Sequence, residues 1–519
     1  MKRRIRRPLP RSEGPWAWLT AGSVAVSLLM LGGLLLLISV RGLGHFWPAP
    51  VTLVELEDGR AIAGRAVREL PLVGQAGSER LYFTGNRDLD GRVWEWVPVS
   101  TIASQERPVD LVVLERRRYG DFIGRLVSVG PIEPTAHPLD QKAVWSRLQA
   151  RLQAQMTLRD ERDRIERDTL RPLVQRVEAN PSDREAREAL ADVNETLRAL
   201  QAAMHGEVVI IESVDGRRLE QPLDEVLHAW RPNAMSTVEK MMAWGQGVWR
   251  FLSEGPRDVN ASGGVWPAIF GTVLMVVLMS LLVTPFGVLA AIYLNEVAHQ
   301  GRMIHLVRIA VRNLAGVPSI VYGVFGLGVF VYGIGSSLDE WFFNDALPSP
   351  TFGTGGLLWA SLTLALLTLP VVIVATEEGL ARIPAEQREG ALALGATRLE
   401  TLTRVVLPMA LPAMLTGVIL AIARAAGEVA PLMLVGVAKL APQVPVDGEF
   451  PFLHLERKFM HLGYHIYDTA FHGNDVQAAL PVVYATALLL VLVILLLNLT
   501  AILLRHYFRA RHGVLARQP

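Results

Sequence analysis

The sequence predicts a multi-pass membrane protein that combines an all-α membrane domain of six transmembrane helices with a separate α+β domain. The 519-residue chain is 51% hydrophobic and 19% charged, which is more apolar than a typical soluble protein. Six apolar runs are nearly free of charge, and each has about 19 residues or more, enough to cross a hydrocarbon core of ~30 Å. A long polar segment separates the first run from the other five and is expected to form its own domain.

The membrane spans follow from the positions of these runs. The first, residues 17–40, follows a basic N-terminal segment, residues 1–16. It exceeds the ~7–15 apolar residues of a signal peptide, which favours an uncleaved anchor over a cleaved signal. The other five lie in a second membrane segment, residues 261–509, and are Val265–Tyr293, Leu314–Tyr332, Gly356–Thr376, Met409–Val437 and Leu480–Leu504.

The Lys and Arg residues of the short connections predict the orientation of the spans. They gather in the N-terminal segment, around residues 302–312, around residues 382–404 and after the last span, whereas residues 333–355 contain neither. Because Lys and Arg are enriched in cytoplasmic connections, we expect both termini in the cytoplasm, including the tail at residues 510–519. The segment at residues 41–232 then lies on the opposite side of the membrane.

Residues 41–232 show two patterns, and the first is that of short β-strands separated by turns. Residues 53–67 and 113–127 resemble each other, since each has a Leu-Glu pair and a later Gly-Arg, which predicts a duplicated small β-barrel unit. The expected strands are Val51–Glu57, Ala61–Val67, Arg80–Phe83, Arg92–Val99, Leu111–Arg116, Phe122–Val129, Val208–Ile211 and Arg218–Leu223.

The second pattern is helical and covers residues 139–203. Asn180-Pro181 interrupts it, and Ser182 followed by Glu185 predicts a capping box at the start of a second helix. We therefore expect two antiparallel helices that form a coiled-coil arm, a structure that commonly serves as a spacer or a docking surface.

Residues 233–260 connect the polar domain to the second span. A helix is expected at Ala234–Ser253, and it carries Trp244 and Trp249, a residue type that is typical of membrane boundaries. The pattern predicts an interfacial helix on the outer face of the membrane. A helix packed within the polar domain fits it equally well.

The most informative motif lies in the cytoplasmic connection between the fourth and fifth spans, residues 377–408. It reads E-G-A, three residues, Gly, nine residues and V-x-L-P, which predicts a short helix, a glycine that ends it and a second helix that enters the membrane. Such a stiff knob can enter a groove on a partner, whereas a loop helix without a partner is the alternative. The residues expected to make the contact are Glu389, Gly390, Ala391, Gly395, Leu407 and Pro408.

The spacing of this motif is similar to that of the EAA loop of bacterial ABC importer membrane subunits, E-A-A, three residues, Gly, nine residues and I-x-L-P. The resemblance implies that separate ATPase subunits dock here. The chain itself contains no Gly-x4-Gly-Lys-Ser/Thr phosphate loop, so it is not expected to bind ATP.

Several classes of site are excluded by composition. The chain contains no Cys, and its His residues show no metal-ligand spacing. No catalytic residue, cofactor, metal site or nucleic-acid partner is therefore predicted, and the chain is expected not to be an enzyme.

Several segments of the second membrane region, together covering about residues 263–509, resemble the PstA family of phosphate importer permeases. The resemblance implies a type I ABC importer permease fold in a bacterial inner membrane, with residues 41–232 as an unusually large periplasmic insert. It also implies a PstC-like permease, a PstB-like ATPase dimer and a PstS-like phosphate-binding protein as partners. The segments are Gly271-Thr272, Ala291–Glu296, Asn313–Gly323, Thr376–Glu378, Arg424–Glu428 with Ala430–Leu432, and His465–Tyr467.

Two positions depart from the family pattern, namely Val429 where Thr is usual and Gly390 where Ala is usual. Neither change removes a charge.

Arg424 and Glu428 are ionisable residues within the predicted fifth span, where a charge is costly unless it faces a cavity or a partner. Their i, i+4 spacing predicts that they share one helix face. The pair could simply neutralise itself and stabilise packing. We favour a role in the substrate path, in which the guanidinium binds an oxyanion and Glu428 moderates its hold.

The predicted function is the permease subunit of an ABC importer for inorganic phosphate. Two alternatives stay open. One is a permease for sulfate or molybdate, and the other is a signalling or assembly membrane protein whose periplasmic insert binds a regulatory partner. The resemblance does not extend to the insert, so the sequence assigns it no partner.

Overall fold

A computed structural model describes residues 15–72, 77–131, 141–180, 182–257, 263–441, 444–448, 450–472 and 476–513. Most of the predicted basic N-terminus and the end of the predicted tail lie outside these residues, as does Pro181 of the predicted arm. The chain forms two compact units. One combines Met1–His45 with Trp249–Pro519, and the other is Phe46–Val248.

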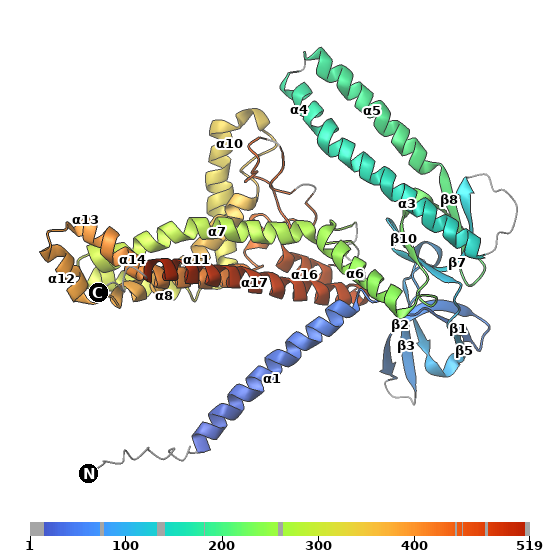
Figure 1. Ribbon diagram of the computed structural model, residues 1–519, viewed down its shortest axis with the longest axis horizontal. Helices are drawn as coiled ribbons and strands as arrows, with labels where there is room; N and C mark the ends of the chain where they lie inside the picture. The colour runs from blue at the N-terminus through green and yellow to red at the C-terminus, as the bar shows by residue number, and fades with distance from the viewer. Residues whose placement is uncertain are drawn as a thin grey trace, which may run out of the picture. The chain divides into compact units, whose positions relative to one another are not determined.

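Six helical segments of the described chain are long and apolar enough to cross a membrane, which confirms the predicted number of spans. They include α1 (Pro15–Gly44), α7 (Trp266–Ile292), α11 (Leu357–Ala381), α14 (Leu407–Ala425) and α17 (Val476–Gly513) (Figure 1). The remaining one, Ser319–Phe342, joins α9 (Ser319–Phe325), a π-helical stretch (Gly326–Gly335) and α10 (Ser336–Phe342).

Two of the predicted spans have wrong bounds. The third begins at Ser319 instead of Leu314, because Pro318 separates it from α8 (Arg302–Leu314), and it extends to Phe342. The fifth runs from Arg398 to Ala425, so its predicted end at Val437 is wrong. The next residues include Gly427 and Pro431, which disfavour a continuing helix, and the chain turns before the short α15 (Leu432–Val435).

Small residues let α11 approach its neighbours α7 and α14 at the centre of the helical unit. A Cβ on Gly287 of α7 would lie 2.6 Å from Val372 of α11, and one on Gly417 of α14 would lie 2.8 Å from Ala375. Close backbone approach of this kind is how membrane helices gain packing energy. As a result, 67% of the apolar window of α11 is buried, compared with none of that of α1.

The other unit contains two β-sheets with the same topology. The first sheet has the order β4-β3-β2-β1-β5, and the second has the order β10-β6-β7-β8-β9. In both sheets the first four strands form a meander, and the fifth strand pairs with the outer edge of the first strand. A short 3₁₀ helix precedes the fifth strand in both sheets. The strands are β1 (Thr52–Leu56), β2 (Ala61–Pro71), β3 (Ser78–Phe83), β4 (Trp94–Pro98), β5 (Ile102–Glu106), β6 (Leu111–Arg116), β7 (Asp121–Pro131), β8 (Glu207–Glu212), β9 (Arg218–Pro222) and β10 (Val226–Trp230).

The strand registers confirm the predicted duplication. Leu53 pairs with Ala63 in the first sheet, as Val113 pairs with Ile123 in the second, and the second strand of each carries an irregularity at the same point. Both second strands have a glycine, Gly64 or Gly124, whose missing Cβ admits the backbone of the third strand. Neither β5 nor β10 was among the expected strands.

The helical arm is an insertion between the second and third strands of the second sheet. It consists of α3 (Gln141–Ile165), a π-turn, α4 (Arg171–Ala179) and the antiparallel α5 (Arg184–His205) (Figure 1). Its base packs on the core of the second sheet through Val144, Leu148 and Leu152. The predicted capping residue is wrong: Asp183 accepts from Ala186 N at 3.0 Å, whereas Ser182 Oγ donates to Asn180 Oδ1 at 2.7 Å.

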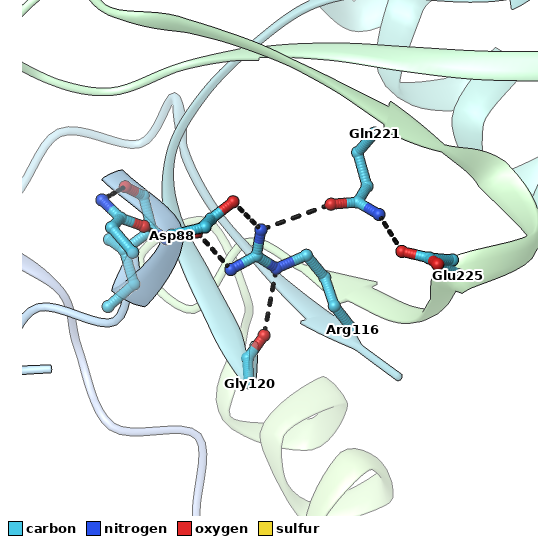
Figure 2. Close-up of polar contacts among 7 residues, drawn as sticks. Asp88, Arg116, Gly120, Gln221 and Glu225 are labelled. Atoms are coloured by element: carbon cyan, nitrogen blue, oxygen red, sulfur yellow. Dashed lines mark hydrogen bonds and ion pairs between the residues drawn. The ribbon is translucent and has the colours of Figure 1, made fainter. Parts of the chain in front are cut away.

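A buried arginine joins the second sheet to the connection between β3 and β4 of the first sheet. Figure 2 shows Arg116 of β6 between Asp88, Gly120 and Gln221. Its Nη1 and Nη2 donate to the two carboxylate oxygens of Asp88 at 2.8 and 2.9 Å, and its Nε donates to the carbonyl of Gly120 at 3.1 Å. Burial acts to raise the pKa of Asp88, but the hydrogen bonds and charge of Arg116 hold it below its ordinary value.

Replacing Arg116 with Met is expected to destabilise this junction by about 3 kcal/mol, because Asp88 then loses a buried partner. Hydrogen exchange of residues 84–91 in the full-length protein should accelerate about 100-fold. Because the pKa of Asp88 is lowered, the difference from wild type should persist at neutral pH and vanish as the pH falls through that pKa. Arg60→Gln is the control, since Arg60 and Asp58 form an exposed pair. Equal exchange in both variants would contradict the prediction.

The connecting helix is α6 (Thr237–Ser253), close to its predicted bounds. Ser236 and Glu239 cap its start reciprocally. Val238, Met241, Met242 and Trp249 are exposed on it. Its placement at a membrane surface stays a prediction.

Candidate coupling and transport site

The predicted knob is present between the fourth and fifth spans. The helix α12 (Ala385–Ala393) begins after Pro384 and is followed by Gly395, whose φ of +90° turns the chain. Thr397 and Glu400 then form a complete capping box at the start of α13 (Arg398–Thr401). A π-turn continues α13 into α14, so the second helix of the knob and the fifth span form one continuous helical segment.

The predicted contact residues occupy different parts of this knob. Glu389, Gly390 and Gly395 are exposed, and Ala391 is half-buried. Leu394, which the sequence analysis did not single out, is 91% exposed, an unusual state for a leucine and a suitable one for an interface. Leu407 is half-buried and Pro408 is exposed in the first turn of α14, away from α12.

An ion pair that the sequence analysis missed holds α12 to the membrane helices. Arg388 Nη2 donates to Glu296 Oε1 at 2.8 Å and to the carbonyl of Leu380 at 2.9 Å, and Nη1 donates to the carbonyl of Ile383. Glu296 lies in the π-turn that follows α7, and Leu380 lies at the end of α11. The knob is therefore tied to the ends of the second and fourth spans.

A second ion pair braces the same end of the bundle. Arg308 of α8 donates to Glu377 Oε1 of α11 at 3.0 Å and to the carbonyl of Leu294 at 2.9 Å. The two carboxylates, Glu296 and Glu377, belong to segments that carry the family resemblance. That resemblance was the signal by which the sequence could have indicated their importance. Their partners could not be assigned because each pair joins residues far apart in the sequence.

The two glycines of the knob provide a matched pair of variants. Gly395→Ala is expected to destabilise the turn by roughly 1–2 kcal/mol, because a Cβ disfavours positive φ. Gly390→Ala is expected to stabilise α12 by roughly 0.5–1 kcal/mol, since Gly390 is helical and no atom lies within 4 Å of the added Cβ. Hydrogen exchange of residues 385–400 in the full-length protein measures the difference. Similar exchange in the two variants would contradict the prediction.

Arg424 and Glu428 do meet, although not on one helix face. The helix α14 ends at Ala425, so Arg424 lies in its last turn and Glu428 lies in the turn that follows. The Nε of Arg424 is 3.5 Å from Glu428 Oε1, yet it has no hydrogen-bond partner among the described residues. The side chains are 34% and 20% exposed. The carboxylate therefore neutralises the guanidinium without saturating its donors.

Metal binding has no support in the part of the chain that the structure describes. No group of three or more His, Cys, Asp or Glu side chains there is arranged to hold an ion. The features that remain are an exposed knob, an ion pair that ties it to the bundle, a second ion pair that braces the same end of the bundle and one partly satisfied arginine at the far end of the fifth helix.

Comparisons with known proteins match the helical unit. The family described as "Binding-protein-dependent transport system inner membrane component" matches residues 283–512. The probable ABC transporter permease protein YqgH of Bacillus subtilis is 33% identical over 224 residues, which are 43% of this chain and 65% of that protein. The phosphate transport system permease protein PstA 1 of Mycobacterium tuberculosis is 33% identical over 260 residues, 50% of this chain and 76% of that protein.

Among solved structures, the MetNI methionine ABC transporter in an inward-facing conformation matches with a TM-score of 0.32 and 17% identity, covering 53% of this chain and 99% of the matched chain. The family match begins at residue 283, beyond the two-sheet unit.

Proposed function

Because the chain belongs to the family of binding-protein-dependent transport system inner membrane components, we propose that it is the membrane subunit of an ATP-driven importer of inorganic phosphate. The observation that carries this proposal is the braced, exposed knob on a bundle that also holds an incompletely satisfied arginine. A knob of this kind is suited to receiving force from a partner. A guanidinium with free donors is suited to binding an oxyanion.

The ion pair between Arg388 and Glu296 suggests how force would pass from the knob to the path. A partner ATPase that moves α12 would pull on the end of α7 through this pair and on the end of α11 through the carbonyl of Leu380. The fifth span continues directly from the knob to Arg424. Alternating access would then follow from movement of these three helices about the arginine.

The charge distribution supports an orientation in which the knob and both termini are cytoplasmic. The two-sheet unit at Phe46–Val248 then lies in the periplasm. The partners would be a second permease of the PstC kind, two ATPase subunits of the PstB kind and a phosphate-binding protein of the PstS kind.

Uptake by the assembled transporter in membrane vesicles tests the substrate. We expect ATP-dependent accumulation of radiolabelled phosphate, with little competition from excess sulfate or molybdate. Vesicles without ATP provide the background. Equal or stronger competition by sulfate or molybdate would show that the chain carries another oxyanion.

A further inference from the structure

The short helix α16 (Leu462–Phe471) carries a buried polar stripe that the proposed function does not use. His461, which caps the helix, is 0% exposed, His465 is 3% exposed and Thr469 is 1% exposed. Residues four apart lie on one helix face. The three side chains therefore form one line along the helix.

Most polar atoms of this stripe have no partner in the part of the chain that the structure describes. Among the described residues, no hydrogen bond reaches His461 Nε2, either ring nitrogen of His465 or Thr469 Oγ1, although all four atoms are buried. Leaving one such atom unsatisfied costs about 1–3 kcal/mol, so native proteins normally give it a protein group, water or a ligand. Four such atoms on one helix face indicate a wet or ligand-bearing lane.

Contacts place one end of this lane, at His461, near the Arg424–Glu428 pair. A Cβ on Gly463 would lie 2.6 Å from the side chain of Val429, the residue after Glu428, and 3.1 Å from the ring of His461. The backbone N of Leu462 donates to Thr272 Oγ1 of α7 at 2.9 Å. At the other end of the stripe, buried Asp468 pairs with Lys439, with Nζ and Oδ2 3.4 Å apart.

The charge state of the lane suits a weakly held anion. Burial lowers the pKa of His461 and His465 to about 4, so both imidazoles are neutral near pH 7. A neutral imidazole offers one N–H donor, and a threonine hydroxyl offers one more. Such donors hydrogen-bond an oxyanion without the full attraction of a fixed charge, which favours passage over retention.

We propose that His461, His465 and Thr469 line a hydrated lane that binds an inorganic oxyanion next to Arg424. This lane rests on the proposed function, because the Arg424–Glu428 pair is its neighbour. It adds three residues that position the anion through neutral hydrogen bonds.

Cysteine accessibility tests the lane directly, because the chain contains no native Cys. Thr469→Cys in the assembled transporter should react with the anionic reagent 2-sulfonatoethyl methanethiosulfonate, and inorganic phosphate should slow the reaction at least several-fold. Thr486→Cys is the matched control, since Thr486 is 0% exposed and its hydroxyl donates to Val482 O at 2.9 Å. Labelling is measured with and without ATP, and His465→Cys provides a second probe.

The possible outcomes test the lane and the identity of the substrate separately. If the Thr469 and His465 variants were as unreactive as the Thr486 variant in both states, or if no oxyanion slowed their labelling, the lane would be wrong. Protection by sulfate or molybdate alone would keep the lane and overturn phosphate as the substrate. The His465→Leu variant should show about tenfold lower phosphate uptake. The His465→Gln variant should show a smaller decrease, because only Gln keeps a hydrogen-bond donor. Equal uptake in the two would contradict the role of the donor.

Discussion

Replacing Arg424 with Gln is expected to reduce ATP-dependent phosphate uptake to the background of vesicles without ATP. The substitution removes the positive charge and the fork of donors, and charge-assisted hydrogen bonds contribute about 1.5–3 kcal/mol each. It also leaves Glu428 unpaired and only 20% exposed, where a negative charge repels an anion. Loss of attraction and gain of repulsion act together, so the predicted effect exceeds about 100-fold.

Two further variants distinguish a path residue from a packing residue. Arg424→Lys keeps the charge but not the fork, and it should retain intermediate uptake. Arg424→Gln combined with Glu428→Gln removes both charges of the pair and leaves none unpaired, yet it should not recover uptake. Arg505→Gln is the control, since Arg505 belongs to α17 and donates to Thr416 Oγ1 at 3.1 Å. Recovery of uptake in the double variant would assign the pair a packing role.

Breaking the ion pair between Arg388 and Glu296 is expected to uncouple ATP hydrolysis from transport. Glu296→Gln should lower phosphate uptake by about 10- to 100-fold while the partner subunits continue to hydrolyse ATP, because α12 still docks but no longer moves α7. The pair is 26% and 19% exposed, so its loss is expected to cost roughly 1–3 kcal/mol. The measurement is the ratio of phosphate transported to ATP hydrolysed in proteoliposomes.

The charge-swapped double variant, Glu296→Arg with Arg388→Glu, provides the decisive comparison. If the contact itself transmits movement, this variant should partly restore the ratio of phosphate transported to ATP hydrolysed. Glu378→Gln is the control, because Glu378 pairs with Arg382 at 3.8 Å in an exposed position, where ion pairs contribute little. If the swap were as inactive as either single variant, or if hydrolysis fell together with uptake, the pair would not be the coupling contact.

The bounds of the spans show where sequence reasoning reaches its limit. Hydropathy located all six spans, because hydrocarbon thickness sets a minimum length for an apolar run. It placed the end of the fifth at Val437, although the helix stops at Ala425 and apolar residues continue through a turn. Hydropathy measures whether a residue tolerates burial and does not measure whether its backbone is helical.

The two-sheet unit shows the same limit for strands. Turn signals and alternating residues predicted most strands, and the repeated Gly-Arg predicted the duplication. The fifth strand of each sheet was missed because neither shows the alternation of buried and exposed residues typical of a strand: β5 is mostly exposed and β10 is mostly half-buried. Each is a strand because the first strand of its sheet pairs with it. Likewise, nothing in the sequence near Arg116 indicates that its partner is Asp88.

By itself, the sequence determined the six membrane spans, the knob with its glycine turn and the identities of Arg424 and Glu428. These features depend on the length of an apolar run or on residues a few positions apart, so they can be read locally. The tertiary structure alone decided that Arg388 meets Glu296, that Arg308 meets Glu377 and that the buried ring nitrogens of His465 and the hydroxyl of Thr469 have no hydrogen-bond partner among the described residues. Each of these depends on how distant helices pack, because whether a buried charge or polar atom is satisfied is a property of its neighbours in space.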